Sequence, residues 1–234
     1  MKIADNVHLI PWVFGHAYIL TEADGMTLID TGFPYSAAWI LSYITWLGRQ
    51  PEDLKRIIVT HADIDHAGCL GPLRSATGAR LATSPVEAEA IGRGETSRRV
   101  GGAGRLRGVI GIAASVVKAA PARVDELLAD GDEMPILGGL RVINTPGHTP
   151  GHISLWSPSR KILFPGDSFA IRFNHFKPYQ GWNVWDMEES IASFRRQADL
   201  RAELVCGGHR CTRRNIDGKF RRGAELFKIG EVLK

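Results

Sequence analysis

The chain has 234 residues, of which 44% are hydrophobic and 23% are charged, and its formal net charge at pH 7 is +4. These proportions are those of an ordinary globular protein and exclude intrinsic disorder, collagen-like sequence and a coiled coil. At about 150 residues per domain, the length fits one large domain or two small ones. The positive charge is too small to indicate a nucleic-acid partner by itself, so none is expected.

The cysteine content and the N-terminal segment bear on the compartment. Three cysteines are too few for a disulfide scaffold, and an odd number suits free thiols in a reducing compartment. The N-terminal segment lacks the basic and apolar regions of a secretion signal. The longest apolar run, 109–117, is far shorter than the roughly 20 residues that cross a bilayer. We therefore expect a cytoplasmic protein with no membrane association.

The first part of the chain predicts a meander of strands and then alternating helices and strands. Short runs of β-branched and apolar residues between turn residues predict the strands, and apolar residues at helical spacing predict the helices. The expected strands are 7–10, 17–20, 27–29, 56–60 and 81–83, and the expected helices are 36–47, 67–77 and 85–91.

The middle of the chain has a different composition. Residues 92–107 contain five glycines and five arginines, and an apolar, alanine-rich helix is expected over 106–119. We interpret the segment 92–120 as a loop and helix insertion. A surface loop with a packed helix is the favoured interpretation, and a lid over an active site is the alternative.

The second part predicts further strands at 140–144, 153–156, 161–164 and 204–206, each closed by a glycine or proline turn. The segment from Asp186 to Glu189 has the form of a capping box and begins a helix that runs to about Leu200. No internal repeat and no linker is visible, so we predict a single α/β (α+β) domain over 1–234.

The strongest chemical feature is a cluster of metal-binding residue types directly after the strand expected at 56–60. The segment from Thr60 to His66 contains two imidazoles and two carboxylates. Both groups are good ligands for zinc, iron or manganese, and a cation would relieve the repulsion between the carboxylates. A solvated polar loop is the alternative, which four such side chains together disfavour. The four side chains are those of His61, Asp63, Asp65 and His66.

Three more candidate ligands lie at the ends of later strands. They are His148, Asp167 and His209, and each has a glycine beside it that lets the backbone approach closely. A β-scaffold holds a metal centre rigidly when its ligands come from the ends of several strands. Seven candidate ligands are enough for two metal ions that share one carboxylate.

These motifs, in this order, resemble those of the metallo-β-lactamase superfamily. The family signature is His-x-His-x-Asp-His followed by a His, an Asp and a His, and the resemblance extends from the opening strands and Asp30-Thr31-Gly32 to His209. The resemblance implies a four-layer αββα sandwich with a dinuclear site at one edge. It also implies that His61 and His148 bind the first metal, that Asp65, His66 and His209 bind the second, and that Asp167 bridges the two.

One position departs from this signature. Asp63 stands where the family has its second histidine. An aspartate still ligates, but it exchanges a neutral nitrogen for an anionic hard oxygen, which makes the site more negative and favours iron or manganese. We expect two divalent metal ions, with zinc as the first expectation and iron or manganese as the alternatives, and we include Asp63 among the ligands.

Further residues are candidates for supporting roles. His152 resembles the second histidine of the family's Pro-Gly-His-Thr-Pro-Gly-His segment, which implies that it organises the loop rather than binding metal. Four other residues are candidates for the substrate pocket, although ordinary packing or surface placement is the simpler interpretation for each. They are His16, His175, Tyr179 and Trp182.

The expected activity is that of a metal-dependent hydrolase. Two cations sharing a water lower its pKa, so that a bridging hydroxide serves as the nucleophile. Asp65 would orient this hydroxide and receive its proton, and Asp167 would bridge the metals. The expected substrate is a small molecule with an ester, thioester, lactone, lactam or phosphoester bond. The oligomeric state stays open, a dimer included.

Other functions are left open by the same residues. Carboxylate-rich variants of the motif occur in diiron oxidoreductases and dioxygenases of the superfamily. The arginines of 92–107 keep a phosphodiesterase acting on a nucleotide-like substrate in consideration. A binding protein without catalytic activity is the third class, and the full set of ligands disfavours it. Metal content and oxygen dependence would separate these functions.

Overall fold

The structure is a computed structural model that describes residues 1–98, 119–172, 175–179, 183–209, 212–215 and 218–226. The chain forms two compact units, Met1–Leu128 and Ala129–Lys234. The expectation of a single domain over 1–234 stays a prediction. Most of the loop and helix expected over 92–120 lies outside the described residues, so that interpretation also stays a prediction.

The first unit is built on one sheet, whose described strands lie side by side in chain order. These strands are β1 Lys2–Ala4, β2 Val7–Leu9, β3 Tyr18–Glu22, β4 Gly25–Ile29, β5 Leu54–Ile58, β6 Arg80–Thr83 and β7 Glu126–Leu127. The first four pair antiparallel, and β2, β3 and β4 form the expected meander. From β4 to β7 the pairing is parallel, and parallel pairing requires a crossover between strands.

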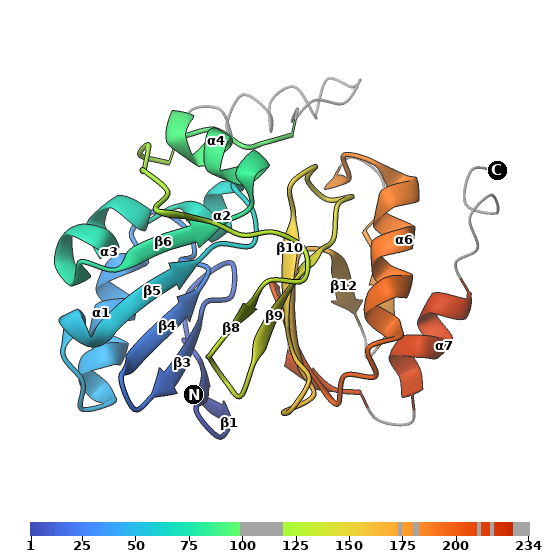
Figure 1. Ribbon diagram of the computed structural model, residues 1–234, viewed down its shortest axis with the longest axis horizontal. Coiled ribbons are helices and arrows are strands. Elements are labelled where there is room, and N and C mark those ends of the chain that lie inside the picture. The colour runs from blue at the N-terminus through green and yellow to red at the C-terminus, as the bar shows by residue number, and fades with distance from the viewer. Residues whose placement is uncertain (99–118, 173–174, 180–182, 210–211, 216–217, 227–234) are drawn as a thin grey trace. The chain divides into compact units, whose positions relative to one another are not determined.

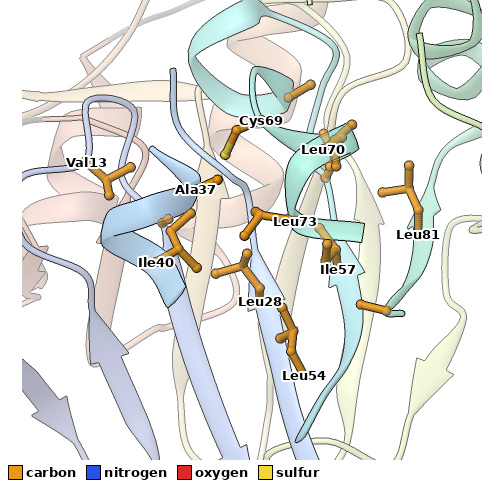
Figure 2. Close-up of a cluster of buried hydrophobic side chains, with 14 of the residues drawn as sticks. Val13, Leu28, Ala37, Ile40, Leu54, Ile57, Cys69, Leu70, Leu73 and Leu81 are labelled. Carbon is orange, nitrogen blue, oxygen red and sulfur yellow. The ribbon is translucent and has the colours of Figure 1, made fainter. Parts of the chain in front are cut away.

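Helices α1 Ala37–Trp46 and α3 Leu70–Thr77 pack against the strands of this sheet (Figure 1). Ile40 of α1 and Leu73 of α3 are fully buried against strand residues such as Leu28 and Ile57 (Figure 2). A fully buried side chain of this size contributes about 1.5–3 kcal/mol relative to an exposed one. This core holds the strand ends that carry the candidate ligands.

The helix expected over 67–77 is interrupted, so that prediction is wrong at its start. Instead, α2 Ile64–Ala67 ends before Gly68, and α3 begins at Leu70. Gly68 donates its N–H to the carbonyl of Gly32 at 3.0 Å. A Cβ on Gly68 would lie 2.5 Å from the nitrogen of Pro34, so only glycine fits this close approach. Asp65 and His66 stand on the helical turn α2, whereas the sequence predicts a loop at this place.

Two further helical segments complete the described part of this unit. The 3₁₀ helix η1 covers Pro51–Asp53, and α4 covers Pro85–Arg93. Helix α4 begins where the sequence predicts, because the Ser84 side chain caps the N–H of Glu87 and Pro85 stands in the first turn. It ends at Gly94, whose φ of +67° suits a glycine at a helix C-terminus.

The second unit is also built on one main sheet, with the order β15-β14-β11-β10-β9-β8 among the described residues. These strands are β8 Glu133–Met134, β9 Leu140–Asn144, β10 Ile153–Ser157, β11 Ile162–Gly166, β14 Leu204–Gly207 and β15 Thr212–Arg214. Strands β11 and β14 pair parallel, and the other neighbours pair antiparallel.

A layer of aromatic side chains packs beside this sheet. The hairpin of β12 Phe169–Arg172 and β13 His175–Pro178 contributes to it, together with α6 Met187–Ala198 and α7 Lys219–Glu225 (Figure 1). The ring of Phe220 has centroid distances of 4.6 Å to Phe169, 4.9 Å to Phe176 and 5.1 Å to Phe194. Phe176 therefore belongs to the core of this unit.

The predicted mixed α/β class is confirmed, while several short elements are absent from the prediction. The unpredicted elements are β1, β7, β8, β12, β13, β15, η1, α2 and α7. Most have two to four residues, and such short segments are stabilised by their neighbours rather than by local propensity. Within the described residues, no helix combines the length and apolar character needed to cross a membrane.

Candidate metal centre

Three neighbouring strands of the first unit end at the same edge of its sheet. Asp30 follows β4, Thr60 and His61 come shortly after β5, and Ser84 follows β6. Because parallel strands bring their carboxyl ends together, residues far apart in the chain can bond here. Thr60 donates its backbone N–H and its hydroxyl to the Asp30 carboxylate, at 2.7 and 2.9 Å.

These bonds orient both histidines of the motif. Nδ1 of His66 lies 2.8 Å from Oδ2 of Asp30 and donates to it. Nδ1 of His61 lies 2.9 Å from the Thr60 hydroxyl, which accepts because its own proton goes to Asp30. In each neutral ring, Nε2 therefore carries the lone pair that a metal ion requires.

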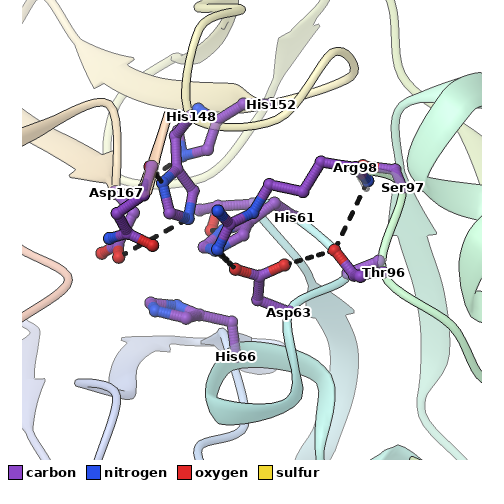
Figure 3. A network of polar contacts seen from close by, with 12 residues as sticks. His61, Asp63, His66, Thr96, Ser97, Arg98, His148, His152 and Asp167 are labelled. Atoms are coloured by element: carbon purple, nitrogen blue, oxygen red, sulfur yellow. Dashed lines mark hydrogen bonds and ion pairs between the residues drawn. The ribbon is translucent and has the colours of Figure 1, made fainter. Parts of the chain in front are cut away.

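Asp63 lies just before α2 and makes two short contacts with the segment after α4. Its Oδ1 accepts from the Thr96 hydroxyl at 2.5 Å, and its Oδ2 accepts from Nη2 of Arg98 at 2.5 Å (Figure 3). The same Oδ2 lies 3.9 Å from Nε2 of His61. The carboxylate is thus held beside a candidate ligand by a cation and a hydroxyl.

Asp65 lies in the first turn of α2, with its side chain half-buried. The loop before β3 packs directly on its backbone. A Cβ on Gly15 would lie only 1.7 Å from the carbonyl oxygen of Asp65, and Gly15 has a φ of +69°. Only glycine meets both conditions. The loop that carries His16 is therefore packed against the metal-binding motif.

The ligand candidates of the second unit also gather at one sheet edge. Asp167 follows β11, His209 comes shortly after β14, and His148 lies in the turn between β9 and β10. Oδ2 of Asp167 lies 3.1 Å from Nε2 of His209 and 3.8 Å from Nε2 of His148. A Cβ on Gly208 would lie 2.3 Å from Oδ1 of Asp167, so a glycine permits this approach.

His148 is oriented by the segment that leads into α6. Its Nδ1 donates to the backbone carbonyl of Asn183 at 2.7 Å, which leaves the lone pair on Nε2. The carbonyl of Gly147 accepts from the N–H groups of Trp185 and Asp186, at 2.7 and 3.0 Å. Asp186 also caps α6 by accepting from the N–H of Glu189 at 3.0 Å. The start of this helix therefore positions the histidine.

His152 supports Asp167 through the backbone. Its Nε2 accepts from the N–H of Asp167 at 3.0 Å (Figure 3). Its Nδ1 lies 2.8 Å from the Thr145 hydroxyl. That hydroxyl also bonds Ser154, which in turn bonds Gln197 of α6 at 3.1 Å. Both ring nitrogens of His152 are engaged in this buried network, which is the arrangement that a loop-organising role requires.

At each of these edges the donor chemistry fits a divalent cation. His61, His66 and His148 each present Nε2 with its lone pair, and Asp167 offers a buried carboxylate. Imidazole and carboxylate are the ligands that zinc, iron and manganese accept in proteins. The assignment of the seven ligands to two metal ions stays a prediction.

The candidate pocket residues have different surroundings. The ring of Tyr179 lies 5.5 Å from that of His148, whereas His175 is exposed on β13. His16 lies 3.4 Å from the hydroxyl of Tyr18 through its Nδ1. Trp182 lies outside the described residues. The pocket role of all four stays a prediction.

Sequence reasoning did not identify the residues that orient the ligands. In the sequence analysis Asp30 appears only as part of a family motif. Its place directly after a buried strand is the signal that could have revealed its role in orienting the histidines. Arg98 gives no such signal, because it is one of several arginines and lies 35 residues from Asp63. The other unpredicted partners are Thr60, Glu87, Thr96, Thr145, Asn183 and Gln197.

Comparison with known proteins decides the family. A sequence profile described as the metallo-beta-lactamase superfamily matches residues 10–209. This chain belongs to the metallo-β-lactamase superfamily. The predicted family is therefore confirmed. The crystal structure of a metallo-beta-lactamase family protein from Thermus thermophilus shares the fold with a TM-score of 0.71 at 22% identity, over 96% of this chain and 79% of that one.

Two curated relatives of this superfamily member come from Bacillus. The probable metallo-hydrolase YflN of Bacillus subtilis strain 168 is 28% identical and covers 89% of this chain and 85% of its own length. An N-acyl homoserine lactonase of Bacillus sp is 25% identical, over 90% of this chain and 84% of its own length. The chain is an enzyme, a metallo-hydrolase of the metallo-β-lactamase fold.

Proposed function

We propose that this metallo-hydrolase uses two divalent metal ions, zinc first among them, to hydrolyse an ester or lactone bond of a small molecule. The observation that carries the metal requirement is the orientation of the histidines. Nδ1 of His61, His66 and His148 is bonded to an oxygen acceptor in each case, so each Nε2 is basic. The relative named as a lactonase supports the choice of bond.

The proposed ligands divide as the family resemblance implies. His61, Asp63 and His148 would hold one metal, and Asp65, His66 and His209 the other, with Asp167 shared between them. The 3.1 and 3.8 Å distances from Oδ2 of Asp167 to the two histidines of its own unit support this shared position. The iron or manganese alternative rests on the extra carboxylate of Asp63.

The chemistry then divides between the cations and the protein. Two bound cations would supply Lewis acidity and make hydroxide available near neutral pH, bridging them as the attacking group. Asp65, half-buried at the start of α2, would orient the attacking water and accept its proton. The bond from the N–H of Asp167 to His152 holds the backbone from which the Asp167 carboxylate extends.

The test combines metal analysis with a substrate panel. Protein purified without added metal is analysed for zinc, iron and manganese. It is then assayed on a lactone, an aryl ester, a thioester, a β-lactam and a bis-aryl phosphate. We expect two equivalents of metal and turnover of the lactone or the aryl ester, lost with a chelator and restored by zinc. Turnover of only another member of the panel would overturn the proposed bond.

Matched variants complete the test. His148→Ala and Asp167→Asn should lose metal-dependent turnover while the fold is retained. His8→Gln removes a histidine that lies 3.2 Å from the hydroxyl of Tyr43, and it should leave turnover unchanged. Full activity in either ligand variant would contradict the site, and oxygen-dependent turnover with two equivalents of iron would favour the oxidoreductase instead.

A further inference from the structure

Three consecutive residues after α4 bond to two acidic side chains at the metal-binding motif. These residues are Thr96, Ser97 and Arg98, which we call the strap. Thr96 and Arg98 bond Asp63 (Figure 3). The Ser97 hydroxyl donates to Oε1 of Glu87 at 2.7 Å. Each member of the strap therefore bonds a carboxylate.

Glu87 connects the strap to the backbone of the motif. It lies in the first turn of α4 and is fully buried. Its Oε2 accepts from the N–H of Ala62 at 2.8 Å. Ala62 is the residue between His61 and Asp63. The strap is thus joined to the motif both at Asp63 and through Glu87. The position of Arg98 is set by several bonds rather than by one mobile side chain.

The ion pair between Asp63 and Arg98 is shielded from water. The side chain of Arg98 is 7% exposed and that of Asp63 is 11% exposed. Water therefore solvates neither charge well, and a buried charge without its partner is strongly unfavourable. Removing either partner would therefore leave the other charge buried and uncompensated.

We propose that Arg98 is a positioning residue that holds Asp63 beside His61 and cancels its charge. The Asp63–Arg98 pair then has no net charge, like the neutral histidine that the family signature has at this position. This changes the expectation from the sequence, in which Asp63 makes the site more negative and shifts its preference toward iron or manganese. The proposal rests on the proposed metal site.

Bonds from Thr96 and Arg98 are compatible with metal binding by the carboxylate of Asp63. A carboxylate has about four lone-pair positions, and the bonds from Thr96 and Arg98 use one on each oxygen. The same Oδ2 that Arg98 binds lies 3.9 Å from Nε2 of His61. Arg98 therefore holds this oxygen near His61, and its positive charge offsets the negative charge of the carboxylate.

The test compares the binding of a borderline and a hard cation. Metal-free wild-type protein and the variants Arg98→Met and Arg98→Lys are titrated with Zn²⁺ and, separately, with Mn²⁺ against a chelating indicator. Removing the guanidinium leaves Asp63 a fully anionic oxygen donor, which favours the harder cation. We expect the ratio of the Mn²⁺ Kd to the Zn²⁺ Kd to fall roughly tenfold in Arg98→Met. In Arg98→Lys it should stay within about twofold, because the charge remains.

A second pair of variants tests the charge argument by rescue. Asp63→His with Arg98 retained leaves a buried cation beside the metal, so the Zn²⁺ Kd should rise roughly tenfold. The double variant Asp63→His/Arg98→Met removes that cation and should return the Zn²⁺ Kd to within about twofold of wild type. A role limited to packing would not produce this rescue.

An exposed arginine provides the control for the Arg98 variants. Arg93→Met removes the same charge from an exposed arginine that pairs with Glu89 and Glu95. This variant should leave the ratio of the Mn²⁺ Kd to the Zn²⁺ Kd unchanged. Thermal unfolding of each metal-free variant checks folding. If Asp63→His fails to fold, the Kd ratios of Arg98→Met and Arg98→Lys are sufficient to test the role of Arg98.

Two results would contradict the proposals in different ways. An unchanged ratio in Arg98→Met, with metal bound by wild type, would overturn the role of Arg98 and leave the metal site intact. A wild-type protein that binds neither cation would overturn the metal site, and the role of Arg98 would fall with it.

Discussion

The carboxylate of Asp30 bonds Nδ1 of His66 at 2.8 Å, although 36 residues separate them in the chain. Parallel pairing of β4 and β5 produces this relationship, because it brings Asp30 to the sheet edge where the motif begins. Through Thr60, the same carboxylate also fixes the ring of His61. One buried carboxylate therefore orients two candidate ligands, and its removal should affect both.

Asp30→Asn should weaken metal binding by roughly 10–100-fold. Asp30 has a φ of +57°, which asparagine tolerates, so the backbone is not the cause of the effect. The amide lacks the charge and one of the acceptor oxygens that serve Thr60 and His66. The measurement is the Zn²⁺ Kd by competition with a chelator. Asp24→Asn, in an exposed turn, is the control, and equal Kd values for the two variants would contradict this role of Asp30.

Gly15→Ala should destabilise the protein by roughly 3 kcal/mol, well beyond the cost of its backbone conformation. The new Cβ would lie 1.7 Å from the carbonyl oxygen of Asp65. Gly48→Ala is the matched control, because Gly48 has a φ of +74° but no atom within 4 Å of its Cβ. That control should cost only about 1–2 kcal/mol. Equal losses in chemical denaturation would show that the Asp65 contact adds nothing.

Asp186→Ala should lower the free energy of unfolding by about 1 kcal/mol, because the N–H of Glu189 loses its cap. Asp186→Ser keeps a capping oxygen and should stay within a few tenths of a kcal/mol of wild type. Urea denaturation measures both. Since the start of α6 also holds the His148 turn, the alanine variant should bind zinc more weakly than the serine variant. Identical stability in the two variants would exclude a capping role.

Stability should fall at high pH because of Cys69. Burial raises the pKa of this thiol from its ordinary value of 9.0 to about 12. The unfolded chain therefore loses the proton first, and the stabilising difference is complete below pH 9 and lost as the pH rises toward 12. Wild type should lose roughly 2 kcal/mol more than Cys69→Ala between pH 8 and pH 10.5. Parallel curves of unfolding free energy against pH would contradict the assignment.

Much of the architecture follows from local signals in the sequence. The strand at 140–144 and the start of α4 at Pro85 agree with the prediction, because hydrophobic periodicity and caps act over a few residues. The expected helix over 67–77 breaks at Cys69, whose φ of −119° and ψ of 28° are not helical, next to Gly68, which lies close to Pro34. That approach involves residues distant in the chain and leaves no local pattern.

The sequence by itself determined the mild net charge, the mixed α/β class, the superfamily and the identity of the candidate ligands, since these depend on composition, periodicity and motif spacing. The tertiary structure alone decided which partners hold those ligands. Asp30 reaches His66 through strand pairing, and Arg98 reaches Asp63 across 35 residues. Such bonds form only when distant parts of the chain fold together. Composition therefore shows Arg98 only as one of many basic residues, whereas the structure shows it as a buried partner of Asp63.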